Sequence, residues 1–245
     1  MSAERAAPAA RRAALFFVLW LAFAAFLGLG GWQLYRLRWK LDLIARVDAR
    51  VQAPPGAAPG PADWSRITRD ADEYRHVALR GEFVAGHDTL VQASTDLGTG
   101  WWVLTPLRDA DGSVVLVNRG FVPDAERDHY AAAPAGAQAV AGLLRPSEPH
   151  GRLLRTNDAA AGHWFSRDVA AIAAARRLAP ADRVAPYFVD ADGPGLRATS
   201  WPAGGLTVVS FPNHHLSYAL TWFGLAALAL FGLRIVRREC AGGHA

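Results

Sequence analysis

Two long apolar runs, one near each end of the chain, constrain the possible folds most strongly. No residue from Ala13 to Tyr35 is charged, and 18 uncharged residues extend from Leu216 to Leu233. A helix rises ~1.5 Å per residue, so 18 residues span about 27 Å, close to the thickness of a bilayer's hydrocarbon core. We therefore expect two membrane-spanning helices, over residues 13–35 and 213–233.

A cleaved signal peptide is the alternative to the first span, because a basic start followed by an apolar run is typical of both. Ala22-Phe23-Ala24 has the small residues of a cleavage site. This triplet lies in the middle of the run, however, and nothing after the run resembles a cleavage site. The pattern therefore favours an uncleaved span.

The charges beside the second span indicate its orientation. Arg234, Arg237 and Arg238 follow it, whereas the nearest charge before it is Arg197, so the C-terminal tail at 234–245 is predicted to be cytoplasmic. Two spans place both termini on the same side of the membrane, so residues 1–12 are expected there too. The charges around the first span are balanced, but a long loop can be translocated despite its charges. The segment between the spans is therefore expected outside the cytoplasm.

The first helix is predicted to continue beyond the membrane as a juxtamembrane helix over residues 36–52. Leu34, Leu37, Leu41 and Ile44 recur at steps of three and four, which is the period of one helix face. This stripe either packs on the chain's own domain or docks a partner. Three aromatic residues lie where an aromatic belt would meet lipid headgroups: Trp32, Tyr35 and Trp39. A Pro/Gly-rich loop at residues 53–62 then ends the helix.

The segment at 63–212 changes to short β-rich pieces separated by turn signals. The predicted strands are Tyr74–Phe83, His87–Ala93, Trp101–Leu107, Ser113–Val117, Gln138–Leu144, Val184–Val189 and Leu206–Phe211. One helix is predicted over Val169–Leu178, with Ser166 as its N-cap and Asp168 near its positive end. The expected fold class is thus an α+β membrane protein. Two transmembrane helices flank an extracytoplasmic, periplasmic domain that contains an antiparallel β-sheet or barrel and one helix.

Most catalytic signatures are absent from the sequence. It has no glycine-rich phosphate loop, metalloprotease helix motif or nucleophile elbow. Its one cysteine, Cys240, lies in the predicted cytoplasmic tail, so the exported domain has no thiol chemistry. The net charge of +4 is modest and the arginines are scattered, which argues against a nucleic-acid surface. An exported enzyme built from distant residues is the least favoured class of function.

Two places stand out for function. In the first, Val117 to Pro123, a strand ends in a compact turn in which Arg119 lies among apolar residues and needs a partner. An internal ion pair is one interpretation, and a contact with a ligand or partner is the other. The second is the start of the last span, where His215, Ala219 and Trp222 share one helix face beside Tyr218. His215 is either an interfacial anchor or an axial haem ligand, with Ala219 leaving room for a flat macrocycle.

Three stretches in order resemble the signature sequences of the surfeit locus protein 1 family. They are Gly31-Trp32-Gln33 with Arg36, Trp39-Lys40 and Leu43-Ile44; Asn118-Arg119-Gly120-Phe121-Val122-Pro123; and His215-Leu216-Ser217-Tyr218-Ala219-Leu220-Thr221-Trp222-Phe223. Tyr74 with Gly81-x-Phe83 and Val103 to Leu107 also stand in family-like places. The resemblance covers nearly the whole chain. It departs at Phe121, where tryptophan is frequent, and in the long Pro/Gly loop.

The resemblance implies an assembly factor for haem-copper cytochrome c oxidase that handles haem A in the bacterial inner membrane. It implies that His215 contacts the haem iron, with Tyr218 and Trp222 beside the macrocycle. Cytochrome c oxidase subunit I, haem A synthase and membrane lipid are the implied partners. Five residues are expected to serve partner contacts or structure: Arg119, Asn118, Trp32, Arg36 and Trp39. A scaffold that binds the nascent oxidase subunit through the Leu34–Ile44 stripe, without touching haem, is the competing hypothesis.

Overall fold

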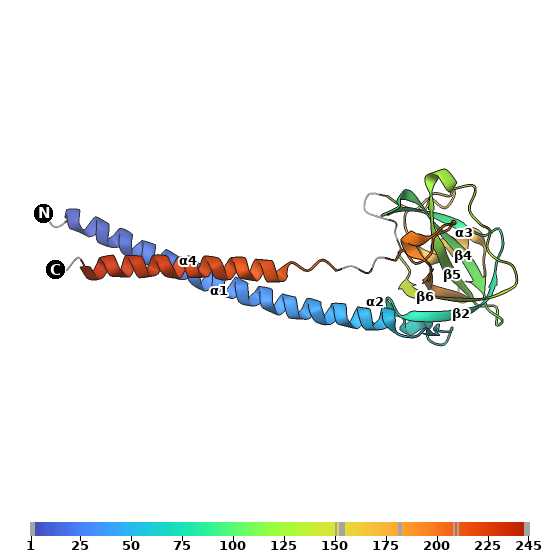
Figure 1. Cartoon of the computed structure of the whole chain (residues 1–245), viewed down its shortest axis with the longest axis horizontal. Coiled ribbons are helices and arrows are strands. Elements are labelled where there is room, and N and C mark those ends of the chain that lie inside the picture. Colours follow the sequence, from blue (N-terminus) through green and yellow to red (C-terminus); the bar gives the residue numbers. More distant parts are fainter. Residues whose placement is uncertain are drawn as a thin grey trace. The chain divides into compact units, whose positions relative to one another are not determined.

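The structure is a computed structural model that describes residues 3–149, 151, 155–180, 183–207, 209 and 211–242. It consists of two units, each with its own internal packing (Figure 1). The helical unit comprises Met1–Arg46 and Ser210–Ala245, and the β-rich unit comprises Val47–Val209. One chain segment at each end of the β-rich unit continues into the helical unit.

Two long helices make up the helical unit. The first, α1 (Ala3–Gln52), is a single helix of 50 residues, and the second, α4 (His215–Gly242), has 28. Both are long and apolar enough to cross a membrane. At ~1.5 Å per residue α1 is about 75 Å long, more than twice the hydrocarbon thickness of a bilayer. The helix therefore continues without a break beyond Tyr35 and ends at the Pro/Gly-rich loop, because Pro54 and Pro55 cannot continue it.

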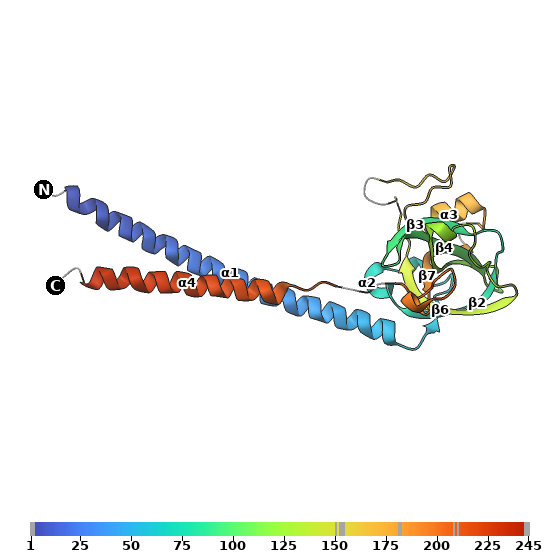
Figure 2. The same cartoon turned by 45° about the horizontal axis from the view of Figure 1, so that its top comes forward.

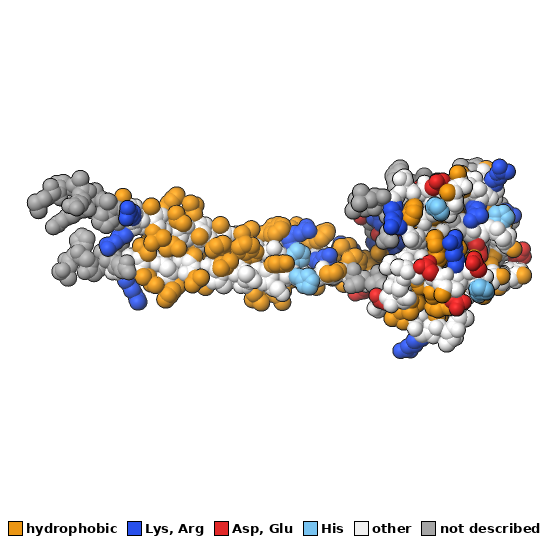
Figure 3. All heavy atoms as spheres, turned by 90° about the horizontal axis from the view of Figure 1, so that it is seen from above, with side chains coloured by type: hydrophobic (Ala, Val, Ile, Leu, Met, Phe, Trp, Pro, Cys, Tyr) orange, Lys and Arg blue, Asp and Glu red, His pale blue; other side chains and the backbone are white. Residues whose placement is uncertain are grey.

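Large apolar side chains cover the outside of the helical unit, as Figure 3 shows. Leu15, Phe17, Trp20 and Leu21 on α1 are all exposed, as are Leu220, Leu228 and Phe231 on α4. A water-soluble surface rarely shows so much contiguous apolar area, whereas lipid tails solvate it without cost. The chain is therefore a membrane protein.

The β-rich unit is built on a closed ring of five strands, visible in Figure 2. The ring runs in the order β2 (His76–Phe83), β6 (Ala137–Pro146), β7 (Val184–Ala191), β5 (Val114–Pro123) and β4 (Gly98–Arg108). Pairing of Glu82 with Arg108 and of Phe83 with Leu107 then joins β4 back to β2. Two further strands attach to this ring, β3 (Thr89–Thr95) beside β4 and β1 (Gly56–Ala57) beside β2. The expected α+β architecture with a barrel-like domain is confirmed.

Successive side chains of a strand point to opposite faces of the sheet, and in this barrel both faces carry apolar residues. Val115 and Val117 on β5 face a cluster with Tyr187 and Val189 of β7, to which β2, β4 and β6 also contribute. Leu116 on the opposite face packs with another cluster, which includes Phe188 and the helix α3 (Val169–Arg176). Because all five ring strands supply the first cluster, it fills the barrel interior, and α3 covers part of the outside.

Short elements complete the domain. They are η1 (Trp64–Arg66), α2 (Arg69–Asp72), η2 (Asp124–Glu126) and η4 (Gly195–Arg197). The Pro/Gly-rich loop is held to the barrel, because Pro59 accepts hydrogen bonds from the Trp64 indole at 2.9 Å and from the Tyr187 hydroxyl at 2.8 Å. Burial raises the pKa of Tyr187, which keeps its hydroxyl a donor.

Three sequence-based expectations were wrong in detail. The sheet is mixed, because β5 pairs with β7 in parallel and β1 with β2 in parallel. Asp168, not Ser166, caps α3, since its carboxylate accepts from the Ala171 amide; the Ser166 hydroxyl instead accepts from the Gly151 amide and Asn157. Leu206 and Thr207 belong to no strand, and the rest of that expected strand lies partly outside the described residues.

Candidate functional site

The start of α4 is set by local hydrogen bonding at the edge of the second apolar run. Pro212 has no amide hydrogen and cannot extend the helix backwards. The side-chain oxygen of Asn213 accepts from the His215 amide at 3.3 Å, and α4 begins at His215. The helix thus begins two residues after the expected start of the span at residue 213. This cap fixes the rotation of the first helical turn and hence the direction of the His215 side chain.

His215 points to α1, where it meets a polar side chain near the end of the uncharged run. Its Nδ1 lies 2.7 Å from Oε1 of Gln33. Gln33 is only 9% exposed, with Gly30 buried one turn before it and the half-buried Arg36 three residues after it. Leaving a buried amide without a hydrogen-bond partner costs on the order of several kcal/mol, because the amide loses its bonds to water. The hydrogen bond with His215 avoids part of this cost. Nε2 of His215 has no hydrogen-bond partner among the described residues.

Two further contacts hold the helices together beside this pair. The rings of Phe26 and Trp222 stack with their centroids 5.7 Å apart and their planes at 26°. A Cβ placed on Gly30 would lie 2.6 Å from the ring of Phe223, so any side chain at this position would displace that ring. Residue numbers rise along α1 as they fall along α4. The two helices therefore pack antiparallel through one face each.

The structure separates the residues expected around a macrocycle. His215, Ala219 and Trp222 all face α1, whereas Tyr218 is 56% exposed and points away from the contact. Ala219 is only 1% exposed. The expectation that Ala219 leaves open space for a flat ring is therefore wrong, because helix packing already covers it. Open surface beside His215 lies on the flank that carries Tyr218 and His214.

The aromatic residues near the end of the first apolar run are on the outside of α1. Trp32, Tyr35 and Trp39 are all exposed, and the Arg36 guanidinium lies 4.7 Å from the centroid of the Trp39 ring. Such a cation–π pair suits the lipid headgroup region, where both partners are only partly hydrated. In the apolar stripe, Leu34 and Leu41 are exposed as well.

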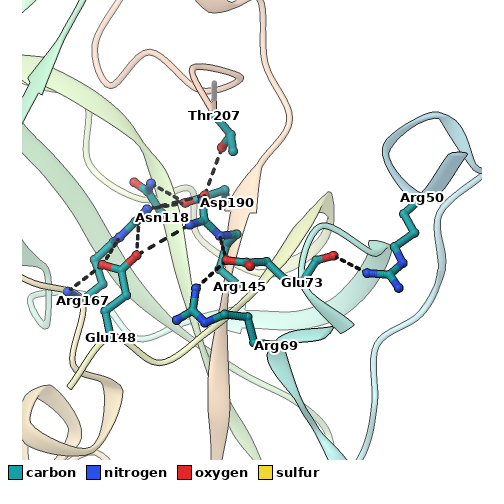
Figure 4. Close-up of polar contacts among 9 residues, drawn as sticks. All are labelled: Arg50, Arg69, Glu73, Asn118, Arg145, Glu148, Arg167, Asp190 and Thr207. Carbon is teal, nitrogen blue, oxygen red and sulfur yellow. Dashed lines mark hydrogen bonds and ion pairs between the residues drawn. The ribbon is translucent and has the colours of Figure 1, made fainter. Parts of the chain in front are cut away.

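The second motif of the sequence, Asn118 to Pro123, lies at the end of β5 and organises a buried charge cluster (Figure 4). Nδ2 of Asn118 donates to Oδ1 of Asp190 on β7 at 2.7 Å, and Oδ1 of Asn118 accepts from the Gly120 amide. Both side chains are buried, and Asp190 is only 4% exposed. Oδ2 of Asp190 accepts from the Thr207 hydroxyl at 3.0 Å.

Two arginines neutralise Asp190. Arg145 lies 3.3 Å and Arg167 3.1 Å from its carboxylate oxygens, and both side chains are almost buried. Glu148 pairs with Arg167 at 2.6 Å. Burial alone would lower the pKa of Arg167, but the charges of Asp190 and Glu148 outweigh it and raise the pKa. Burial likewise opposes the charged form of Glu148, yet Arg167 and Arg145 lower its pKa overall. Arg167 and Glu148 therefore stabilise each other's charged forms.

The cluster extends to both ends of the β-rich unit, as Figure 4 shows. Glu73 lies 3.4 Å from Nε of Arg145, and its backbone carbonyl accepts from Arg50 in the last turn of α1. Arg50 also donates to the Asp70 carbonyl at 2.8 Å. At the other end, Thr207 belongs to the segment that follows the barrel. Hydrogen bonds and ion pairs thus connect Arg50, in the last turn of α1, through Glu73, Arg145 and Asp190 with Thr207.

Arg119 lies inside the domain rather than on an open surface. Its side chain is 10% exposed, and Nη2 donates to the carbonyls of Ala131 and Ala132 at 2.8 and 3.0 Å. Nη1 lies 3.9 Å from Asp88, which is a long ion pair. Burial lowers the pKa of Arg119 despite this carboxylate. The contacts favour the internal role of Arg119, which holds the loop at 131–132 against β5.

Two contributors were not among the sequence-based site residues. Gln33 is part of the first motif, and its signal was a single amide inside an apolar helix that must find a partner. Asp190 lies near the end of β7, directly after an apolar run. No local pattern marks it, because its partners lie on β5, on β6 and beside α3. Within the described residues no group of three or more His, Cys, Asp or Glu side chains is placed to hold a metal ion.

Comparison with known proteins identifies the relatives of this chain. A sequence model described as the SURF1 family matches residues 20–227. A SURF1-like protein of Monosiga brevicollis is 32% identical, over 99% of this chain and 94% of the relative. Surfeit locus protein 1 of Mus musculus is 35% identical over 91% of this chain and 76% of the relative, and that of Homo sapiens is 34% identical over 87% and 74%.

The family match includes most of α1, the whole barrel and the first half of α4. It therefore contains Gln33, the Asn118 motif and His215, which carry the contacts described above. Since both the family model and relatives more than 30% identical extend over most of its length, this chain belongs to the SURF1 family.

Proposed function

We propose that this protein assists the assembly of a haem-copper cytochrome c oxidase by handling haem A on its way to the catalytic subunit. Membership of the SURF1 family supports the role in oxidase assembly. The two membrane-capable helices support action at the membrane. The arginines after the second span favour the bacterial inner membrane orientation in which the barrel is periplasmic.

The observation that carries the haem proposal is the setting of His215. A neutral imidazole binds iron through a nitrogen lone pair while its other nitrogen donates a hydrogen bond. Nδ1 of His215 is occupied by Gln33, and Nε2 has no partner among the described residues. The donor set therefore fits a haem with one protein ligand. Tyr218, one helical turn after His215, is exposed and available beside a bound ring.

A protein that delivers haem must also release it. One axial ligand at the edge of two helices binds less tightly than ligands on both faces in an enclosed pocket, because fewer bonds form and more of the ring stays in lipid. We therefore propose a chaperone without catalytic turnover. It would receive haem A from its synthase and pass it to subunit I of the oxidase. Trp222 contributes through its stacking on Phe26, which stabilises the helix pair that presents His215.

A scaffold that never contacts haem is the second candidate function. Exposed apolar side chains on α1 favour it, since Leu34, Trp39 and Leu41 are available for a helix of the nascent oxidase subunit. Arg36 beside Trp39 adds a charge for an acidic partner group. This function needs the outer face of α1 but not Nε2 of His215.

An absorption spectrum with pigment extraction separates the two functions. The full chain is purified in detergent from cells that make haem A, beside His215→Ala and the neighbouring control His214→Ala. Haem A near one equivalent in the parent and the control, but not in His215→Ala, is the expected result. Haem-free folded protein in all three, with oxidase subunit I copurified, would replace the proposal by the scaffold.

A further inference from the structure

Gln33 is a buried amide in the contact between two membrane helices, and this placement needs a reason beyond packing. An apolar side chain of the same volume would pack there without the cost of desolvating an amide. Gln33 instead directs Oε1 at Nδ1 of His215 over 2.7 Å. A carbonyl oxygen can only accept, so Nδ1 is the donor in this hydrogen bond.

The direction of this hydrogen bond decides the chemistry of the imidazole. In a neutral histidine one ring nitrogen carries the proton and the other carries the lone pair. A proton held on Nδ1 by Gln33 leaves the lone pair on Nε2, the nitrogen without a partner among the described residues. Only a nitrogen with a free lone pair can bind a metal.

We infer that Gln33 is a positioning residue that holds His215 in its Nδ1–H form and so presents Nε2 as a ligand to an iron-centred macrocycle. This inference rests on the proposed function for the identity of the ligand, but the tautomer itself does not depend on haem. Hydrogen bonds to the outer nitrogen of a ligating histidine also raise its basicity and fix its ring orientation.

The surrounding packing makes the contact rigid. The Asn213 cap fixes the first turn of α4, and the Gly30 approach to Phe223 brings α1 close enough for Gln33 to reach His215. Stacking of Phe26 on Trp222 fixes the helix register one to two turns away. The imidazole therefore has one supported orientation, with its Nε2 edge turned from Gln33.

The first experiment reads the tautomer without any haem. The full chain is labelled with ¹⁵N-histidine, reconstituted in detergent at pH 8, and the His215 signals are assigned by difference from His215→Ala. The expected result is a protonated Nδ1 and a bare Nε2 in the parent protein. Gln33→Leu removes the acceptor and is expected to move the proton to Nε2 in a large fraction of molecules. Gln33→Glu restores an acceptor and should restore the Nδ1–H form.

The second experiment measures binding of ferric haem, added to the apoprotein in detergent and followed by its absorption band. Loss of an outer hydrogen-bond partner typically lowers metal affinity about 10- to 100-fold. Gln33→Leu should therefore bind ferric haem at least about 10-fold more weakly than the parent protein does. Gln33→Glu should restore most of the lost affinity, and His214→Ala should match the parent. Circular dichroism of each variant confirms that both helices are retained.

The outcomes separate the inference from the proposed function. A parent protein that has the proton on Nε2, or a tautomer unchanged in Gln33→Leu, overturns the role of Gln33 even where haem binds through His215. A Gln33-dependent Nδ1–H form in a protein that binds no haem, with or without Gln33, overturns the ligand role and the proposed function together. Loss of affinity that Gln33→Glu does not restore, with the tautomer unchanged, would reduce Gln33 to a packing residue.

Discussion

Asn118 on β5 donates a 2.7 Å hydrogen bond to Asp190 on β7, and this pair is the centre of the charge cluster in the barrel. Asp190 is also the shared partner of Arg145, Arg167 and Thr207. A carboxylate with this many donors is satisfied despite its burial, whereas its removal deprives Arg145 and Arg167 of the most buried of their carboxylate partners. The relationship predicts where the domain is most sensitive to substitution.

Asp190→Asn is expected to destabilise the full chain by about 3 to 5 kcal/mol, the range for breaking a buried ion pair. Urea unfolding followed by tryptophan fluorescence measures the change. Asp190, Arg145 and Arg167 line a cavity of about 380 Å³. Asp96→Asn is the control, because Asp96 is an exposed carboxylate that lines the same cavity. A loss of less than about 1 kcal/mol in Asp190→Asn, the scale of a surface pair, would contradict the proposed importance of the cluster.

His76 predicts a pH dependence of stability. Its Nε2 lies 2.8 Å from the Asp192 carboxylate and its Nδ1 2.8 Å from the Ala53 carbonyl. Burial acts to lower the pKa of His76, but these two contacts outweigh it and raise the pKa above 6.5. Since the folded pKa is the higher one, the stabilisation is fully present below the unfolded pKa and is lost as the pH rises through the folded value.

His76→Gln should therefore cost most stability near pH 6, by about 1 kcal/mol or less, and very little near pH 9. Unfolding midpoints at the two pH values give this difference. His87→Gln is the matched control, because the His87 ring bonds the Ala85 carbonyl and no carboxylate among the described residues. An equal loss at both pH values would show that the imidazolium form is not stabilised.

Gly120 is expected to tolerate no side chain. Its φ of +138° lies in a region that favours glycine, and a Cβ there would collide with the Ala203 backbone. Gly120→Ala should cost at least about 2 kcal/mol, from strain and from displacement of the segment that pairs with Phe121. Gly112 also has a positive φ of +87° but open space around it, so Gly112→Ala should cost about 1 kcal/mol. Thermal unfolding measures both losses of stability. Equal losses in the two variants would show that the close contact between Gly120 and the Ala203 backbone does not affect stability.

Arg119→Ala is expected to lower stability by about 1 to 3 kcal/mol, because the Ala131 and Ala132 carbonyls lose their donor. Burial and the neighbouring Asp88 raise the pKa of Tyr130 to about 12, so its phenol stays neutral and adds no second negative charge beside Asp88. Arg80→Ala, at an exposed position on β2, serves as the control. Unchanged stability of Arg119→Ala with impaired oxidase assembly would instead assign Arg119 to a partner contact.

The helix contact predicts different results for two neighbouring glycines. Gly30→Leu should separate α1 from α4, since Phe223 occupies the space beside Gly30, and the His215 tautomer should then become mixed. A Cβ added at Gly31 would have no neighbouring atom within 4 Å, so Gly31→Leu should leave the His215 signals unchanged. The same ¹⁵N-histidine spectra report both. Identical spectra for the two variants would mean that the helices do not approach each other through Gly30.

Much of the architecture was predictable, because it depends on local properties of the chain. Run length and charge indicated two membrane-capable helices, and the two long helices of the structure cover nearly all of the expected spans. Six of the predicted strands correspond to β2 to β7, since alternation and turn residues are local signals. The expected strand at Leu206–Phe211 failed at Leu206 and Thr207, where the hydroxyl of Thr207 instead bonds Asp190.

The sequence by itself determined which segments are helices and strands and which motifs carry function, since residue spacing and composition are properties of neighbours along the chain. Only the tertiary structure decided which side chains meet. Gln33 and His215 are 182 positions apart, and Asn118 and Asp190 are 72 apart. Their pairing follows from helix rotation, strand order and close packing around Gly30 and Gly120. Those features minimise the cost of burying polar groups over the whole molecule, and no local pattern records them.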